Sequence, residues 1–206
     1  MDDIIHRITG KNSSEEIIRE EYGEAVYKEF DLWVSAKIKT IHPLSRPYLI
    51  NISGIPCAGK STLSQKILNQ NPFLLYISFD EIMESLSLYQ NDYKSHGQEY
   101  AFKKWEIPAR YLGYKLLQTS IKNNYPILFE HSNANTLHID LYRWIKNQGY
   151  YLEIRFINID IDSAEERSKK RNRYMPLEII KERYEQLQKI NLKLQLIADK
   201  FEIISP

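Results

Sequence analysis

The sequence predicts an α/β fold in which helices cover both faces of a parallel five-stranded sheet. Short apolar stretches alternate along the chain with stretches of helical periodicity. The apolar stretches show little polar alternation, as expected of strands that are buried on both faces. A loop with two glycines, GIPCAG, directly follows the first apolar stretch and precedes a helical one. These three observations indicate a three-layer, doubly wound arrangement.

Five segments read as strands. Each is a short apolar run with polar or turn-forming residues at its ends. The last one, FEII, is the weakest. The five segments are residues 48–53, 73–79, 125–130, 151–159 and 201–204.

Helical periodicity fills the intervals between these strands. Pro108 falls within one long helical stretch and predicts a kink there. The last helix starts near Pro176 and carries a single apolar stripe. The expected helices cover residues 60–70, 81–90, 97–122, 136–148, 163–173 and about 176–197.

A helical extension is expected before the sheet, over residues 1–46. SSEE at residues 13–16 fits a capping box, and apolar side chains then recur at helical spacing. Pro43 and Pro47 interrupt any helix at the end of this segment. Residues 47–206 contain all the expected strands, and we predict that they form one globular domain.

Composition narrows the classes of protein that fit. The 206 residues are 43% hydrophobic and 27% charged, which suits one domain with a real core. A formal net charge of +1 gives no overall attraction to nucleic acid or membranes. The single cysteine, Cys57, excludes an internal disulfide and suits a reducing compartment. No stretch approaches about 18 uninterrupted apolar residues, and the polar N-terminus lacks the apolar segment of a signal peptide. We therefore expect a soluble, cytoplasmic protein.

The stretch GIPCAGKS fits the phosphate-loop pattern G-x-x-x-x-G-K-[ST] and stands between a strand and a helix, as that pattern requires. Gly54 and Gly59 let the backbone N–H groups turn toward phosphate oxygens, and the following helix adds its positive dipole end. Lys60 is placed to reach the β- and γ-phosphates, and the Ser61 hydroxyl to coordinate Mg²⁺. We predict a site for ATP and Mg²⁺ formed by Gly54, Ile55, Pro56, Cys57, Ala58, Gly59, Lys60, Ser61 and Thr62.

Asp80 follows the second expected strand, at the edge where open parallel sheets bind ligands. A carboxylate there can accept the proton of a substrate hydroxyl as that hydroxyl attacks the γ-phosphate. The alternative is that Asp80 caps the helix that starts beside it, and the two roles can coexist.

Glu130 ends the strand YPILFE with an acid. A carboxylate in this place can hold Mg²⁺ or its waters, or can bind substrate. His131 comes next, and we expect it to be a hydrogen-bonding loop residue because no second His or Cys stands at metal-ligand spacing.

A basic cluster, AEERSKKRNRYMP, follows the fourth expected strand. Asp162 and Glu165 can cap the start of its helix, and Arg167 and Arg171 then share one face at i and i+4, with Arg173 just beyond. Arginines held over a triphosphate stabilise the charge that develops on the transferring group. The alternative is a solvated basic face.

The order of these motifs resembles the zeta-toxin-like family of P-loop kinases, and more loosely chloramphenicol phosphotransferase and polynucleotide kinases. The resemblance covers about residues 47–206 and is carried by GIPCAGKST, SFDEIM, YPILFEHSN and the basic cluster. It implies the P-loop NTPase fold with strand order 2-3-1-4-5, and ATP and Mg²⁺ at the phosphate loop. It also implies Asp80 as the base, Glu130 in the substrate pocket, and Arg167 and Arg173 at the phosphates. From its place on the helix face shared with Arg167, we expect Arg171 to bind the nucleotide as well.

One departure from the family bears on the acceptor. Zeta toxins commonly follow the acid with a Gly-Thr and an Arg that grip a nucleotide sugar, whereas residues 131–135 read HSNAN. We expect phosphate transfer to a hydroxyl of a small molecule or nucleotide sugar.

Two other functions stay open at this point. One is a polynucleotide 5′-hydroxyl kinase, in which Tyr89, Tyr93, Tyr100 and Trp105 would stack on bases. The other is a non-enzymatic nucleotide-binding interaction module. A protein partner for the N-terminal helices is a further possibility.

Overall fold

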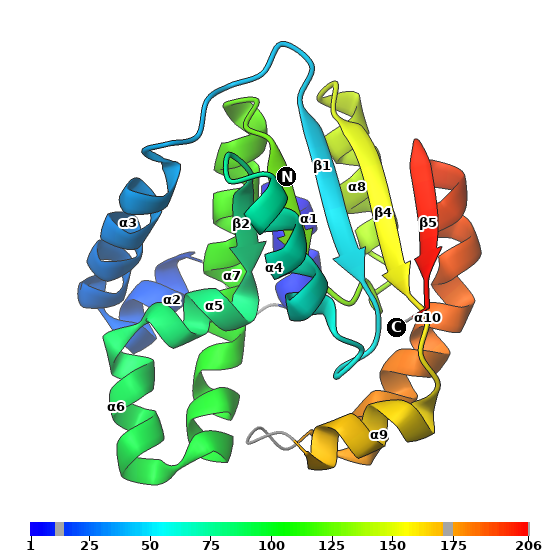
Figure 1. Cartoon of the computed structure of the whole chain (residues 1–206). Helices are drawn as coiled ribbons and strands as arrows, with labels where there is room; N and C mark the ends of the chain where they lie inside the picture. Colours follow the sequence, from blue (N-terminus) through cyan, green and yellow to red (C-terminus); the bar gives the residue numbers. More distant parts are fainter. Residues whose placement is uncertain (11–14, 171–174, 206) are drawn as a thin grey trace.

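A parallel five-stranded sheet forms the centre of the computed structural model, which describes residues 1–10, 15–170 and 175–205. The strands lie in the order β2-β3-β1-β4-β5, and every neighbouring pair is parallel (Figure 1). This confirms the predicted fold class and strand order. The strands are β1 (Tyr48–Ser53), β2 (Leu75–Ser78), β3 (Ile127–Glu130), β4 (Tyr151–Ile157) and β5 (Lys200–Ile204).

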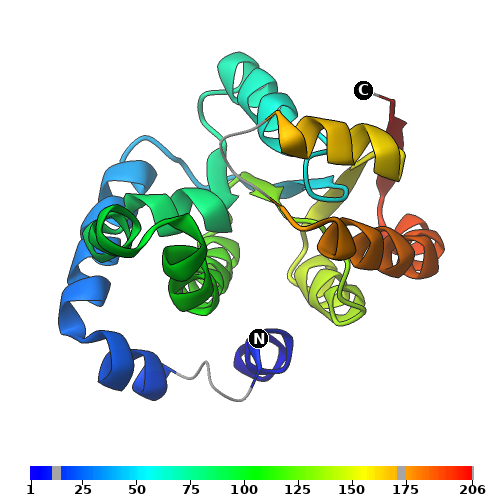
Figure 2. The same ribbon diagram turned by 90° about the horizontal axis from the view of Figure 1, so that it is seen from below.

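Helices cover both faces of the sheet (Figure 2). Helix α4 (Lys60–Gln70) lies on one face, and α9 (Ile161–Lys169) lies on the same side. Helices α7 (Gln98–Lys122) and α8 (His138–Asn147) lie on the other face, and α10 (Leu177–Ile197) packs against α8 and β5. The central strands are therefore covered on both sides, which explains why their sequences read as apolar runs.

One polar residue in the middle of β1 pins the loop that follows β3. Asn51 is fully buried, and its amide donates to the carbonyl oxygen of Phe129 at 3.0 Å. Its side-chain oxygen accepts a 2.6 Å hydrogen bond from the amide of Asn133, whose own oxygen accepts from the Tyr142 hydroxyl at 2.7 Å. Because buried polar groups are costly unless paired, this chain of bonds fixes the loop next to the phosphate loop.

One helix prediction needs correction. The single helix expected over residues 81–90 is two helices, α5 (Phe79–Ser85) and α6 (Ser87–His96). Leu86 separates them in an extended conformation and is fully buried, so core packing breaks the helix where no proline or glycine does. Pro108 lies inside α7, and the kink expected there stays a prediction.

The start of α9 also differs from the prediction. Its N-cap is Asp160, whose carboxylate accepts a 2.7 Å hydrogen bond from the backbone N–H of Ser163. Asp162 and Glu165 therefore lie within the helix instead of capping it. The helix ends at Lys169, whereas the prediction extended it to residue 173. Residues 171–174 lie outside the described residues.

The N-terminal extension forms three helices, α1 (Asp2–Thr9), α2 (Glu15–Tyr22) and α3 (Glu24–Ile38). Helix α1 packs against α7 and α8 on the back of the sheet (Figure 1). Apolar side chains from all three helices belong to the same core as the sheet: Ile5, Ile18, Val26 and Phe30 are all buried. Residues 13 and 14 of the predicted capping box lie outside the described residues. The division at residue 46 stays a prediction.

Within the described part of the chain, no helix has the length and apolar character needed to cross a membrane.

Candidate active site

The phosphate loop joins β1 to α4 through a tight turn. Gly54 and Gly59 have φ angles of 145° and 101°, which side chains other than glycine rarely adopt. A Cβ on Gly54 would also lie only 3.0 Å from the carbonyl oxygen of Ile157. Gly59 is the N-cap of α4, so the first N–H groups of that helix open onto the loop without intrahelical acceptors. The loop therefore has the form of a cradle for an anion.

Lys60 stands at the mouth of this loop. Its ammonium donates to the carbonyl oxygens of Gly54 and Ile55, at 3.1 and 2.9 Å. Arg167 approaches from α9, where its guanidinium donates to the carbonyl oxygen of Ala58 at 3.0 Å. The structure thus brings two cations to the phosphate loop from positions far apart in the sequence. Arg171 and Arg173 lie outside the described residues.

Glu130 ends β3, the strand next to the phosphate-loop strand, and is almost entirely buried. Its carboxylate accepts hydrogen bonds from the hydroxyls of Ser61 and Ser64, both at 2.8 Å, and of Tyr76 at 2.6 Å. Burial and the negative charge of Glu130 raise the pKa of the Tyr76 phenol, which keeps it a proton donor. Three hydroxyls therefore orient one carboxylate beneath the loop.

The oxygens of Ser61 and Glu130 fit a hard cation such as Mg²⁺. Among the described residues, no group of three or more His, Cys, Asp or Glu side chains could hold a metal. A divalent ion here would therefore take its remaining ligands from water and phosphate oxygens, which is how Mg²⁺ is commonly bound.

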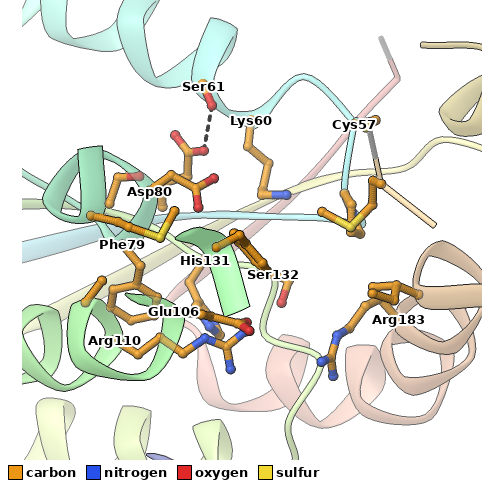
Figure 3. A pocket seen from close by; sticks show the side chains of 18 of the residues that line it. Cys57, Lys60, Ser61, Phe79, Asp80, Glu106, Arg110, His131, Ser132 and Arg183 are labelled. Carbon is orange, nitrogen blue, oxygen red and sulfur yellow. Dashed lines mark hydrogen bonds and ion pairs between the residues drawn. The ribbon is translucent and has the colours of Figure 1, made fainter. Parts of the chain in front are cut away.

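Asp80 lies in the first turn of α5, with its side chain exposed to the pocket that the phosphate loop borders. The N-cap position of α5 belongs to Ser78, so Asp80 does not occupy the capping position that the alternative interpretation assigned to it. Figure 3 shows Asp80, Lys60 and Ser61 at the same end of the pocket.

A cavity of about 270 Å³ connects the phosphate loop with α5, α7 and α10. Of the predicted site residues, it is lined by Pro56, Cys57, Gly59, Lys60, Ser61, Asp80 and Glu130. Gly54, Ile55, Ala58 and Thr62 belong to the loop and the first turn of α4 but do not line the cavity.

Three charged residues that were not predicted from the sequence lie at the other end of this cavity. Glu106 and Arg110 come from α7 and form an ion pair at 2.7 Å, and Arg183 comes from α10. Figure 3 shows all three side chains extending into the pocket. Each has the sequence context of an ordinary helix surface, so no local motif marks it.

His131 forms part of the cavity wall and has the hydrogen-bonding role predicted for it. Its Nδ1 accepts a hydrogen bond from the backbone N–H of Asn133 at 3.0 Å, and the centroid of its ring lies 4.3 Å from that of the His138 ring. Burial, His138 and Arg110 lower the pKa of His131 well below its ordinary value. Burial also lowers the pKa of His138 to about 4. Both rings are therefore neutral near pH 7, and this wall carries no charge of its own.

Two of the four aromatic residues proposed for base stacking belong to the core. Tyr89 and Trp105 are buried, and the Trp105 indole donates to Asp92 at 2.6 Å. Tyr93 and Tyr100 are exposed. The interpretation of all four as one stacking surface is therefore wrong.

The strand order, the phosphate loop and the helix that begins at Gly59 define a P-loop NTPase fold. The Zeta toxin family model matches residues 33–204. Because the match covers more than half of the chain, the protein belongs to the Zeta toxin family. The matched region begins within α3, before the predicted domain boundary.

Solved structures show the same fold at low sequence identity. One comes from the characterisation of the PezAT chromosomal toxin-antitoxin system of the human pathogen Streptococcus pneumoniae. It has a TM-score of 0.73 and 15% identity over 88% of this chain and 77% of the other. A native AvrRxo1-ORF1:-ORF2 complex gives a TM-score of 0.66 and 11% identity over 88% of this chain. The same complex with ATP gives 0.65 and 10% identity over 90% of this chain. This protein spans 64% of the length of the matched chain in both AvrRxo1 structures.

Proposed function

We propose that this protein is an ATP-dependent kinase that transfers the γ-phosphate to a hydroxyl group of a small molecule or nucleotide sugar. The observation that carries the proposal is a single cavity bordered by Lys60 and Ser61 on one side and by the carboxylate of Asp80 on another. A nucleotide switch needs the phosphate loop alone. A kinase also needs room for an acceptor beside the loop, with a base at hand.

ATP would supply the phosphoryl group, and Mg²⁺ would neutralise part of the negative charge on its phosphates. The loop from Gly54 to Thr62 binds the phosphates, and Lys60 stabilises the β- and γ-oxygens. Ser61 and Glu130 would hold Mg²⁺, with Tyr76 and Ser64 keeping the carboxylate of Glu130 in place. Arg167, and with it Arg171 and Arg173 from the same segment, stabilises charge on the transferring group.

Asp80 is the base in this scheme. It takes the proton from the acceptor hydroxyl, whose oxygen forms the new bond to phosphorus while the bond to the β-phosphate oxygen breaks and ADP leaves. The exposed position of Asp80 on the pocket wall suits a residue that must reach a bound acceptor. The cavity volume of about 270 Å³ favours a small acceptor over a polynucleotide.

A protein partner is part of the proposal. The chain belongs to the Zeta toxin family, and one structure of the same fold comes from work on a toxin-antitoxin system. We propose that this protein is likewise a toxin that an antitoxin restrains, and that it acts in the cytoplasm, where ATP is abundant.

The test is to incubate the purified protein with γ-labelled ATP, Mg²⁺ and a metabolite extract, and to identify the species that gains label. We expect one hydroxyl-bearing metabolite to be labelled, and labelling roughly a hundredfold slower or more with Asp80→Asn. Hydrolysis of ATP with no labelled acceptor across sugars, nucleotide sugars, antibiotics and oligonucleotides would support the nucleotide-dependent interaction module instead.

A further inference from the structure

Two arginines from different helices line the end of the cavity that lies away from Ser61 (Figure 3). Arg110 belongs to α7 and Arg183 to α10, 73 positions further along the chain by their numbers. Their side chains are 31% and 29% exposed, so both guanidinium groups are partly withdrawn from solvent. Partly buried arginines around a cavity form a region of strong positive potential.

The two arginines act on the same wall of the cavity. Arg110 contributes to the lowered pKa of both His131 and His138, and Arg183 contributes to that of His138. These histidines are neutral near pH 7, so they give the two arginines no negatively charged partner. Each arginine has an acid nearby: Glu106 lies 2.7 Å from Arg110, and Glu182 lies 3.8 Å from Arg183. Because Glu182 is 56% exposed and its pair with Arg183 is long, it offsets the positive charge of Arg183 only weakly.

Neighbours on their own helices hold both side chains in place. Arg110 contacts Glu106 through one nitrogen, at 2.7 Å, and Arg183 donates to the side-chain oxygen of Gln186, also at 2.7 Å. A guanidinium carries five N–H groups in a planar fork, so one such contact leaves donors for a ligand. This fork matches the oxygens of carboxylate and phosphate groups.

We propose that Arg110 and Arg183 form an anion subsite for the phosphate acceptor. The acceptor is then a hydroxyl compound that also carries a carboxylate or a phosphate group. The anionic group binds the two arginines, while the hydroxyl lies toward Asp80 and the phosphate loop. This inference rests on the proposed kinase function and adds the chemical class of its substrate.

Matched acceptors test the class directly. Glucose, gluconate and glucose 6-phosphate differ in the anionic group, and glycerol, glycerate and glycerol 3-phosphate give a second, smaller set. With γ-labelled ATP and Mg²⁺, we expect kcat/KM for the best anionic compound to exceed that of its neutral counterpart by about 100-fold, a typical effect of losing charge-assisted hydrogen bonds. The carboxylate and phosphate members distinguish the two kinds of anion. The acceptor found in the metabolite extract must also be anionic.

Substitutions assign the effect to the two side chains. Arg110→Gln and Arg183→Gln each should raise KM for the anionic acceptor about tenfold or more, with Kd for ATP unchanged. A matched control is Lys103→Gln, because Lys103 is an exposed cation on the same helix as Arg110 and does not line the cavity. Arg143→Gln on α8 is the corresponding arginine control, since Arg143 is 65% exposed. Both controls should leave transfer unchanged. A weaker Kd for ATP in the two cavity variants would instead place these arginines on the nucleotide.

The outcomes separate this inference from the proposed function. Equal transfer to neutral and anionic acceptors, unaffected by either substitution, would overturn the anion subsite and leave the kinase standing. If no compound is phosphorylated, binding is measured directly by titrating malonate and inorganic phosphate into protein saturated with a non-hydrolysable ATP analogue and Mg²⁺. One saturable anion site that is lost in the double variant supports the subsite even when the kinase proposal fails, and absence of that site overturns it.

Discussion

The hydroxyl of Tyr76 on β2 donates a 2.6 Å hydrogen bond to the carboxylate of Glu130 on β3. This bond joins the two strands on one side of β1 and holds the carboxylate at the carboxyl end of β3, the edge of the sheet where the phosphate loop also begins. Lys37 of the N-terminal extension lies over the Tyr76 ring, at 5.5 Å, and forms an ion pair with Glu81, the neighbour of Asp80. The extension is therefore in contact with residues that border the site.

Tyr76→Phe removes one of the three donors to the buried carboxylate of Glu130 while keeping the ring. We expect the free energy of unfolding to fall by about 1–2 kcal/mol, because a buried acceptor loses a partner. If Glu130 holds the metal, half-maximal activity will also need more Mg²⁺. Denaturant unfolding and a Mg²⁺ titration measure the two effects. Tyr151→Phe, at an exposed position on β4, is the control and should change neither.

Lys60→Ala removes the cation at the mouth of the phosphate loop. Affinity for ATP should fall, and phosphate transfer should drop by roughly a hundredfold or more, as expected for the loss of a preorganised electrostatic donor. Nucleotide titration and the transfer assay measure this. Lys66→Ala, at an exposed position on the same helix, should behave as the unsubstituted protein. Full transfer by a folded Lys60→Ala protein would contradict the assignment of the loop.

Asp80→Asn keeps the size of the side chain but cannot accept the proton of the acceptor hydroxyl. Stability should change by well under about 1 kcal/mol, because Asp80 is exposed and does not occupy the N-cap position of α5. Affinity for ATP should hold while transfer falls by roughly a hundredfold or more. Melting temperature, nucleotide affinity and transfer are all measured on this variant. Near-normal transfer would remove Asp80 from the mechanism.

Deleting residues 1–44 tests the predicted division between the extension and the kinase domain. The deletion strips buried side chains from the common core and removes the ion pair between Lys37 and Glu81. We expect a lower melting temperature or aggregation of the remainder, because apolar surface on α7 and α8 becomes exposed. An unchanged melting temperature and a monodisperse truncated protein would show that the extension is a detachable arm.

Stability should depend on pH through the buried histidines. The pKa of His138 is lowered to about 4, so between its ordinary value of 6.5 and 4 the unfolded chain binds more protons than the folded one. Stability is therefore fully present above about pH 6.5 and is lost as the pH falls toward 4. The free energy of unfolding, measured with denaturant at each pH across this range, should change less with pH for His138→Gln. The exposed His42, replaced by Gln, should leave this pH dependence unchanged.

Most of the fold could be predicted from short-range features of the sequence. The apolar run of β1 and the glycine-lysine-serine pattern after it are short-range features, and both appear where the sequence predicted them. The break between α5 and α6 could not be predicted, because burial of Leu86 in the core decides it and no local residue signals it. The cap of α9 was misplaced because three acids lie close together and the end of β4 determines which one is used.

The end of the cavity lined by Glu106, Arg110 and Arg183 could not be predicted from the sequence, for a different reason. Glu106 and Arg110 stand four positions apart on a helix, a spacing that is typical of solvated surface pairs. Only the packing of α7 and α10 around the loop after β3 turns them toward a cavity with Arg183. Such sites depend on contacts between distant segments, which periodicity and motif spacing do not encode.

The docking of α1 on α7 and α8 also has a consequence for how the chain is made. Arg7 faces Asp140, 133 positions later, so part of the surface that α1 binds is synthesised long after α1 itself. Until α7 and then α8 are made, the apolar face of α1 lacks its native contacts. Translation therefore releases α1 before its binding surface exists, and that surface includes α8 only after α8 has emerged.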